Sequence, residues 1–223
     1  MTRVKICGIT SEADAAICVE AGADALGFVV EYPLPVPWTI GRSRAAELMR
    51  SVPPFVTRVA VVGGEAAEIL AIAETTRADV LQLHLDETES TVTAVRSGLE
   101  GTGTRIVKAI RISADGVVPG ATHWTALARR FLDAGADAIL LDSKTSNRPA
   151  GTGKALDWSL AREVAAELDA PLVLAGGLTP ENVAVAIGSV RPYGVDVISA
   201  VEDDSHRKRP ERVVAFVAAA RTA

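Results

Sequence analysis

Two side chains suited to proton transfer each stand at the end of an apolar segment. Cys7 follows RVKI, and Asp142 follows AILL. Burial penalises an ionised carboxylate, so an acid in such a place usually has a partner or a chemical task, although it can also cap the next loop. A free cysteine is most often a small buried hydrophobe, and we interpret Cys18, on the apolar stripe of a helical segment, in that way. If Cys7 and Asp142 meet in one pocket, a thiolate and a carboxylic acid form an acid–base pair.

A second segment has the composition of an anion site. Residues 174–183 are LAGGLTPENV, so an apolar strand ends in Gly176 and Gly177, and a helix is expected to begin near Thr179. Free backbone N–H groups at a helix start bind phosphate, and glycines let the anion approach closely. Ser199, in DVISAVEDD, would bring further N–H groups beside them. The pattern favours a phosphate site, with a simple tight turn as the structural alternative.

Two other features have a functional and a structural interpretation. Residues 143–158, SKTSNRPAGTGKALDW, are a long Gly-, Ser- and Thr-rich segment, either a lid over a phosphorylated ligand or a surface insert. His84 ends LQLHL and is either a catalytic or ligand-facing residue or a structural one. The three histidines, at 84, 123 and 206, are too scattered for a metal site, and no nucleophile elbow supports a Ser-His-Asp triad.

The elements that must position these residues alternate along the chain. A helix end, a small residue or turn, an Ala-Asp or Val-Asp pair and an apolar run recur at 20–30, 76–85, 133–142 and 191–201. Such runs are typical of parallel strands buried on both faces. The strand candidates are residues 3–9, 25–30, 56–62, 79–85, 105–112, 138–143, 171–176 and 195–201. Helix candidates with apolar positions three and four apart include 11–22, 65–76, 124–135, 159–169 and 210–222.

This pattern predicts an α/β fold, a single (β/α)8 TIM barrel over residues 1–223. A doubly wound open sheet is the rival, but it usually has fewer strands and a Gly-rich fingerprint after the first, which KICGIT lacks. In a barrel the active site lies at the C-terminal ends of the strands. That rule selects Cys7, Asp142, the Gly176–Gly177 pair and Ser199, together with Glu31, His84, Arg111 and Glu202.

Composition narrows the class of protein. The chain has 223 residues, 48% of them hydrophobic, and a net charge of −5, which argues against general nucleic-acid binding. No apolar run approaches the ~20 residues of a membrane helix, and the N-terminus has no signal-peptide layout. Two cysteines do not suggest a disulfide-stapled secreted domain. We expect a soluble cytoplasmic protein.

Several motifs occur together in a specific order. VKICGIT at the start, QLH, LLDS followed by GTGKALDW, LAGGLTPENV and GVDVISAVE span nearly the whole chain. Together they resemble phosphoribosylanthranilate isomerase, an enzyme family of tryptophan biosynthesis. The resemblance implies one (β/α)8 barrel without metal or organic cofactor, acting on a small phosphoribosyl substrate as a monomer or homodimer. It implies an Amadori rearrangement of an aminoaldose to an aminoketose.

The resemblance also implies residue roles. Asp142 matches the general acid that protonates the ribose ring oxygen, and Cys7 matches the general base that removes the C2′ proton. The phosphate would lie on Gly176, Gly177, Ser199 and Ala200. Asp196 matches a family aspartate, and His84 and Gly153, in the QLH and GTGK motifs, are further expected substrate contacts.

The chain departs from the family at the end of the site away from the phosphate. The family usually has an arginine in a Ser/Thr-Pro-Arg sequence after the second strand, which pairs with the anthranilate carboxylate. Here the stretch is PVPW, within EYPLPVPWTIGR at 31–42, so Trp38 takes that place, and an indole supplies no cation. Arg42 and Arg44, at the expected start of the next helix, are the candidate substitutes, and we take Arg42 as a candidate substrate contact. Leu85 and Ala200 replace family glycines, and Ile198 replaces a serine.

Three functions follow from this pattern. The first is phosphoribosylanthranilate isomerase with a variant carboxylate contact. The second is a related isomerase of another phosphoribosyl amine or phosphosugar, in which Trp38 stacks on a ring. The third is a non-catalytic phosphosugar-binding barrel, which the joint presence of Cys7 and Asp142 disfavours.

Overall fold

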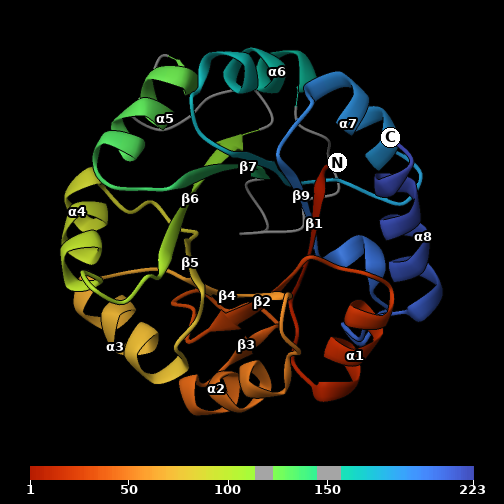
Figure 1. The fold of residues 1–223 in the computed structure, drawn as a ribbon, viewed down its shortest axis with the longest axis horizontal. Coiled ribbons are helices and arrows are strands. Elements are labelled where there is room, and N and C mark those ends of the chain that lie inside the picture. The colour runs from red at the N-terminus through yellow and green to blue at the C-terminus, as the bar shows by residue number, and fades with distance from the viewer. Residues whose placement is uncertain (114–122, 145–156) are drawn as a thin grey trace.

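The computed structural model describes residues 1–113, 123–144 and 157–223. Helices surround a central ring of strands, as Figure 1 shows. The strands are β1 (Arg3–Cys7), β2 (Ala25–Val30), β3 (Thr39–Ile40), β4 (Thr57–Val62), β5 (Val80–Leu83), β6 (Arg105–Ser113), β7 (Ala138–Lys144), β8 (Leu172–Leu174) and β9 (Gly194–Val197). The helices are α1 (Glu12–Glu20), α2 (Arg42–Ser51), α3 (Ala66–Thr76), α4 (Glu89–Gly98), α5 (Trp124–Asp133), α6 (Trp158–Glu167), α7 (Val183–Val190) and α8 (Pro210–Arg221).

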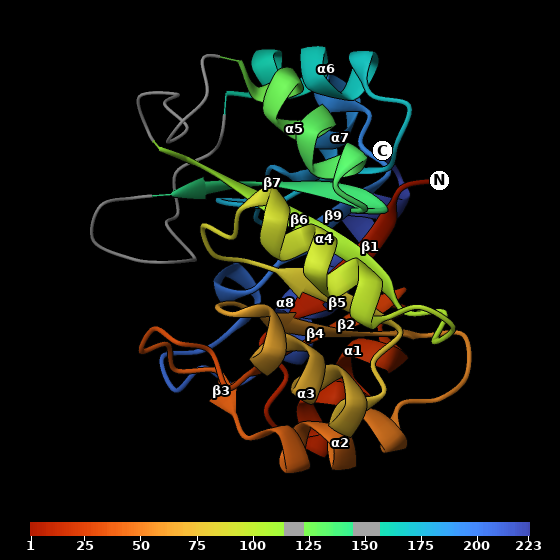
Figure 2. The same ribbon diagram turned by 90° about the vertical axis from the view of Figure 1, so that its left-hand side faces the viewer.

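The sheet closes on itself. Strand β1 pairs in parallel with both β2 and β9, with Cys7 opposite Gly27 and Lys5 opposite Asp196. The remaining strands follow in the order β9-β8-β7-β6-β5-β4-β2, which completes an eight-stranded parallel barrel. Figure 2 shows this barrel from the side, with α3, α4 and α5 packed outside the strands. The predicted (β/α)8 fold is confirmed; the assignment of residues 1–223 to one domain stays a prediction.

Several strand ends differ from the sequence prediction. Strand β1 ends at Cys7, not at residue 9, because Gly8 has a positive φ of 78° and turns the chain. Strand β8 ends before Gly176, which also has a positive φ, of 81°. The last strand was predicted to continue to residue 201, but β9 ends at Val197 and a 3-10 turn, η1 (Ser199–Val201), follows.

The stiff segment 31–42 contains an unpredicted strand. Thr39 and Ile40 form β3, which pairs with Val29 and Val30, beyond the last β1–β2 pair at Gly27. The segment therefore lies against the end of β2 as a short extension of the sheet.

One helix begins where the sequence predicted, and another begins later than predicted. The Ser11 side chain caps α1 by accepting the Asp14 N–H at 3.2 Å, which agrees with the helix predicted over residues 11–22. Helix α7 begins at Val183 and not near Thr179, because residues before it form a turn in which the Asn182 side chain accepts the Thr179 N–H and donates to the Gly177 carbonyl.

The recurring aspartate of the sequence pattern has a structural role at three of its four positions. Asp24, Asp79 and Asp137 each precede a strand and accept a backbone N–H from a neighbouring strand. The donors are Val4 at 2.7 Å, Arg58 at 2.8 Å and Ile106 at 2.7 Å. The fourth, Asp196, lies inside β9 and has another partner, described below.

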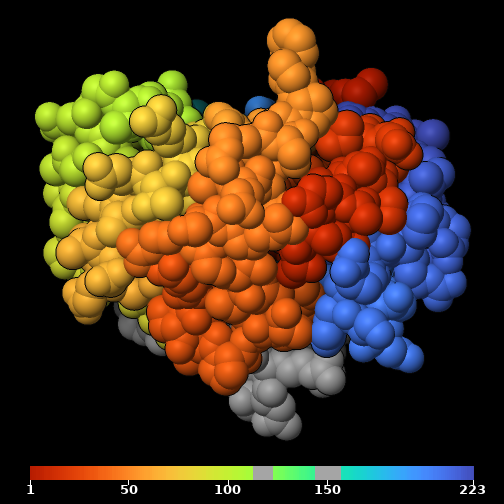
Figure 3. Space-filling view, turned by 90° about the horizontal axis from the view of Figure 1, so that it is seen from below, coloured from red at the N-terminus to blue at the C-terminus, as the bar shows by residue number. Residues whose placement is uncertain are grey.

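The face of the barrel at the N-terminal ends of the strands carries a projecting residue. Phe55, between α2 and β4, is fully exposed and has a φ of 72°. The orange projection at the top of Figure 3 belongs to this connection. Among the described helices, none has the length and apolar character needed to cross a membrane.

Candidate active site

A cavity of about 280 Å³ opens at the C-terminal ends of the strands. Most residues selected from the sequence line it. They are Cys7, Trp38, His84, Asp142, Gly176, Gly177, Asp196, Ser199 and Ala200. Gly153 and most of the expected lid lie outside the described residues.

Cys7 belongs to a buried group of charges. Lys5 and Cys7 lie two residues apart on β1 and therefore share a face of the strand. The Lys5 ammonium lies 2.7 Å from Asp196 Oδ2. A Cβ on Gly27 would lie 2.7 Å from Cys7 Sγ and 2.9 Å from Lys5 Nζ, so this glycine leaves room for both groups.

These contacts act on the thiol in opposite directions. Burial raises the pKa of the Cys7 thiol, the Lys5 ammonium lowers it, and the pKa lies above its ordinary value as a result. Burial lowers the pKa of Lys5, but Asp196 and Cys7 more than offset this, so its pKa is raised and the amine stays charged. A cation thus stands beside Cys7, the one thiol among the described residues that line the cavity.

Asp142 lies across the cavity in contact with a histidine. Its Oδ2 is 3.1 Å from His84 Nε2, and His84 Nδ1 is 2.9 Å from Gln82 Nε2. All three side chains are buried. Gln82, which was not predicted as a site residue, lines the cavity too.

The glycine pair lines the cavity beside Asp142. Gly176 and Gly177 have φ values of 81° and 67°, which other residues rarely adopt. A Cβ on Gly176 would lie 2.4 Å from the Ser143 backbone nitrogen, so no side chain fits there. Ser199 and Ala200, in the 3-10 turn after β9, line the cavity with this pair.

Trp38 is a fixed part of the cavity wall. Its indole N–H donates to Glu202 Oε2 at 3.1 Å, and its ring meets His206 edge to face with centroids 5.5 Å apart. A Cβ on Gly8 would lie 2.8 Å from both Trp38 Cδ1 and Ile198 Cδ1. Two positions at which the chain departs from the family therefore pack on the same glycine, beside Cys7.

The arginines proposed as substitutes for the family arginine have other partners. Arg42 Nε lies 2.8 Å from Glu31 Oε2, and its Nη2 lies 3.1 Å from Glu68 Oε2, outside the cavity lining. Arg44 pairs with Glu12 at 2.7 Å. The placement of Arg42 as a substrate contact is therefore not supported by its position, because local ion pairs hold it at the start of α2.

Some functional neighbours were missed in the sequence. Lys5 and Gln82 are polar residues inside otherwise apolar strands, each two positions before a selected residue. That spacing puts Lys5 on the same strand face as Cys7, and Gln82 on the same strand face as His84. It was the feature of the sequence from which both could have been predicted as site residues. Within the described residues, no group of three or more His, Cys, Asp or Glu side chains is placed to hold a metal ion.

Comparison with known proteins identifies the family. A family model described as N-(5′-phosphoribosyl)anthranilate (PRA) isomerase matches residues 4–219. The chain belongs to the N-(5′-phosphoribosyl)anthranilate isomerase family. The family resemblance predicted from the sequence motifs is confirmed.

Relatives of the same name cover the whole chain. The N-(5′-phosphoribosyl)anthranilate isomerase of Haloferax volcanii is 43% identical over 225 residues, covering 100% of this chain and 95% of the relative. That of Citrifermentans bemidjiense is 42% identical, covering 99% and 98%.

Solved structures of the family are similar along their whole length. Phosphoribosyl anthranilate isomerase from Thermotoga maritima superposes with a TM-score of 0.82 at 35% identity, covering 100% of both chains. A phosphoribosyl anthranilate isomerase in complex with reduced 1-(o-carboxyphenylamino)-1-deoxyribulose 5-phosphate superposes with a TM-score of 0.79 at 32% identity, again covering both chains completely. A 3-hexulose-6-phosphate synthase, at 13% identity and a TM-score of 0.71, shares the fold alone.

Proposed function

We propose that the protein isomerises N-(5′-phosphoribosyl)anthranilate to the carboxyphenylamino-deoxyribulose phosphate. The observation that supports this best is the position of Cys7 and Asp142 in one cavity, which the Gly176–Gly177 pair also lines. A thiol, a carboxyl group and a phosphate-sized anion site are the groups that this Amadori rearrangement uses. The cytoplasmic location expected from the sequence stays a prediction.

Asp142 acts first, as the general acid. Its carboxyl proton passes to the ribose ring oxygen, the bond from C1′ to that oxygen breaks, and the bond's electron pair stays on the oxygen. The lone pair of the anthranilate nitrogen then forms the C1′ iminium. Asp142 is left as a carboxylate in a buried place, where His84 contacts it.

Cys7 acts second, as the general base. The thiolate takes the C2′ proton, the C2′–H electron pair forms the C1′–C2′ double bond, and the iminium nitrogen regains its lone pair. The resulting enol tautomerises to the ketone. Lys5 serves this step because its ammonium stabilises the thiolate that must form before the proton is taken.

The phosphate and the aglycone occupy opposite ends of the cavity in this proposal. The phosphate contacts the backbone at Gly176, Gly177, Ser199 and Ala200. The aryl ring lies against the apolar wall beside Cys7. That wall includes Val29, Val61 and Trp38.

One observation favours the second candidate function, an isomerase of a different phosphoribosyl amine. Among the described residues that line the cavity, there is no lysine or arginine. An aglycone without a carboxylate would therefore suit this wall better than anthranilate does.

Turnover of defined substrates separates the candidates. The wild-type protein is mixed with N-(5′-phosphoribosyl)anthranilate, and loss of substrate fluorescence is followed. Rapid loss supports the proposal. No loss at high enzyme concentration, with turnover of another phosphoribosyl amine, favours the second candidate. Binding without turnover across a panel of such amines would mean a non-catalytic barrel.

A further inference from the structure

The two ring nitrogens of His84 contact two different side chains. Gln82 Nε2 lies 2.9 Å from Nδ1, and Asp142 Oδ2 lies 3.1 Å from Nε2. Gln82 is 2% exposed, His84 7% and Asp142 5%, so bulk water does not compete for these contacts. The three side chains form one chain of hydrogen bonds from β5 to β7.

The amide of Gln82 decides which imidazole nitrogen is protonated. In this structure the Gln82 amide nitrogen faces His84 Nδ1, and because an amide nitrogen only donates, the contact is a hydrogen bond when Nδ1 carries no proton. The proton of the neutral imidazole is then on Nε2, and this N–H donates to Asp142 Oδ2.

This hydrogen bond makes the two oxygens of Asp142 unequal. A proton on Oδ2 would face the His84 N–H, so Oδ2 is the acceptor oxygen. The other oxygen, Oδ1, lies towards β8, where a Cβ on Gly176 would be only 2.7 Å from it. Asp142 and Gly176 both line the cavity, and Oδ1 is the Asp142 oxygen on the Gly176 side, away from the His84 contact at Oδ2.

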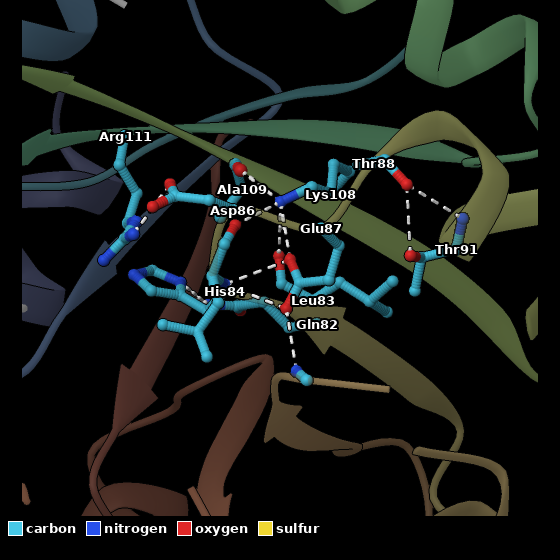
Figure 4. A network of polar contacts seen from close by, with 12 residues as sticks. Gln82, Leu83, His84, Asp86, Glu87, Thr88, Thr91, Lys108, Ala109 and Arg111 are labelled. Atoms are coloured by element: carbon cyan, nitrogen blue, oxygen red, sulfur yellow. Dashed lines mark hydrogen bonds and ion pairs between the residues drawn. The ribbon is translucent and has the colours of Figure 1, made fainter. Parts of the chain in front are cut away.

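The backbone around His84 is held in place. The Tyr32 hydroxyl donates to the His84 carbonyl at 2.7 Å, and the His84 N–H donates to the Val62 carbonyl at 2.9 Å. On the other side, the buried Lys108 ammonium donates to the Leu85 carbonyl at 2.7 Å and pairs with Glu87 at 2.8 Å. Figure 4 shows the contacts of Lys108 with Glu87 beside His84. The backbone of His84 is therefore fixed, so its imidazole is held in a position to orient Asp142.

We propose that Gln82 and His84 are positioning residues that assign the transferable proton of Asp142 to Oδ1. The inference rests on the proposed function, in which Asp142 is the general acid. During transfer the Oδ1–H bond breaks and the new O–H bond forms on the ribose ring oxygen. His84 Nε2 stays protonated throughout. Its N–H stabilises the Asp142 carboxylate that remains through a charge-assisted hydrogen bond.

The test reads the protonation of His84 directly. The wild-type protein is labelled with ¹⁵N-histidine, and the His84 signals are identified by their retention in the His123→Asn and His206→Asn variants. The expected spectrum near neutral pH has an unprotonated Nδ1 and a protonated Nε2. A proton on Nδ1 in the wild-type protein would overturn the inference, and this measurement does not depend on which substrate is turned over.

Two substitutions connect the tautomer to catalysis. In Gln82→Glu a carboxylate replaces the amide and can only accept, so Nδ1 becomes protonated and Asp142 loses its preference for Oδ1. We expect kcat to fall about 10-fold or more, since a wrong histidine tautomer is costly in acid–base catalysis, while KM changes little. In Gln82→Met the side chain neither donates to Nδ1 nor accepts from it, so neither tautomer of His84 is favoured. Its kcat is therefore expected between those of the wild type and Gln82→Glu.

The outcomes separate the inference from the proposed function. Thermal melting establishes that both variants are folded before their kinetics are compared. A Gln82→Glu protein with Nδ1 protonated and full kcat would overturn the inference while leaving the acid role of Asp142 intact. Absence of wild-type turnover of N-(5′-phosphoribosyl)anthranilate would instead contradict the proposed function, and kcat would then be compared on the phosphoribosyl amine that is turned over.

Discussion

The Lys5 ammonium lies 2.7 Å from Asp196 Oδ2 and faces the Cys7 thiol on the same side of β1. Gly27 on β2 has no side chain at the point where both groups approach it. Burial alone would leave Cys7 a poor source of thiolate, since it raises the thiol pKa. Lys5 is therefore the main group that lowers the pKa of the Cys7 thiol and favours its thiolate, with a smaller contribution from Lys208.

Substitution of Lys5 by methionine should raise the pKa of Cys7 further. With the cation gone, less thiolate forms at a given pH, so the acid limb of the kcat/KM profile moves to higher pH. The pH dependence of Cys7 alkylation by iodoacetamide measures the same shift in a Cys18→Ala background. An unchanged alkylation profile would show that Lys5 does not act on the thiol.

The double variant Lys5→Met with Asp196→Asn is the control for folding. Removing one partner of a buried ion pair costs about 3–5 kcal/mol, because the other charge is left unpaired. The double variant removes both charges and should recover much of that stability. Its Cys7 pKa should lie below that of Lys5→Met, because the Asp196 carboxylate that raises it is also gone, but above that of the wild type, because the cation is absent.

Substitution of Trp38 by arginine should not increase turnover of N-(5′-phosphoribosyl)anthranilate. The indole N–H is bonded to the buried Glu202 carboxylate, so a guanidinium at this position would pair with that acid before it reached a ligand. We expect kcat/KM to fall, because the apolar wall beside Cys7 is lost. A gain of about 10-fold or more, which is about 1.4 kcal/mol, would favour the second candidate function.

Substitution of Gly176 by alanine should weaken phosphate binding and destabilise the fold. The residue has a φ of 81°, and a Cβ would lie 2.4 Å from the Ser143 nitrogen. The expected result is a raised KM and a lower melting temperature. Gly188→Ala in α7 is the matched control: nothing lies within 4 Å of its Cβ, and alanine in a helix interior should stabilise by about 0.5–1 kcal/mol. Equal effects of the two substitutions would contradict this account of the glycine pair.

Substitution of Asp137 by asparagine should reduce stability at neutral pH and have little effect in strong acid. Partial burial raises the pKa of Asp137, but the Ile106 N–H and two arginine side chains outweigh it, so the pKa lies below its usual value. A carboxylate with a lowered folded-state pKa stabilises the fold above its unfolded pKa of about 3.9, and the contribution disappears as pH falls through the folded-state value.

Urea unfolding at several pH values measures this dependence. The expected loss near pH 7 is about 1.5–3 kcal/mol, the usual range for hydrogen bonds to charged groups. A loss that is the same at pH 7 and at acid pH would contradict a contribution from the charge of Asp137.

The barrel and several key residues of the cavity were predictable because both follow from local patterns. Apolar runs bounded by helices identify parallel strands, and the rule that active sites lie at the strand ends selected Cys7, Asp142 and Gly176. Strand ends were less predictable. Glycines with positive φ, such as Gly8, ended strands earlier than the hydrophobic pattern indicated.

Contacts between distant segments could not be predicted from local patterns. Lys5 and Asp196 are 191 positions apart and meet only because β1 closes the barrel against β9. Trp38 and Glu202 are 164 positions apart, so the sequence placed the tryptophan at the mouth but not its partner. Arg42 was considered for the ligand because of its place after β2, yet Glu31 and Glu68 hold it at the start of α2.

The most direct test of the proposed acid–base pair is the kcat of Cys7→Ala and Asp142→Asn on N-(5′-phosphoribosyl)anthranilate. Each should fall by about 10²–10⁴-fold, the usual contribution of a positioned acid or base. Cys18→Ala, which removes the other cysteine, from α1, is the matched control and should keep wild-type kcat. Wild-type kcat in either Cys7→Ala or Asp142→Asn would contradict the account.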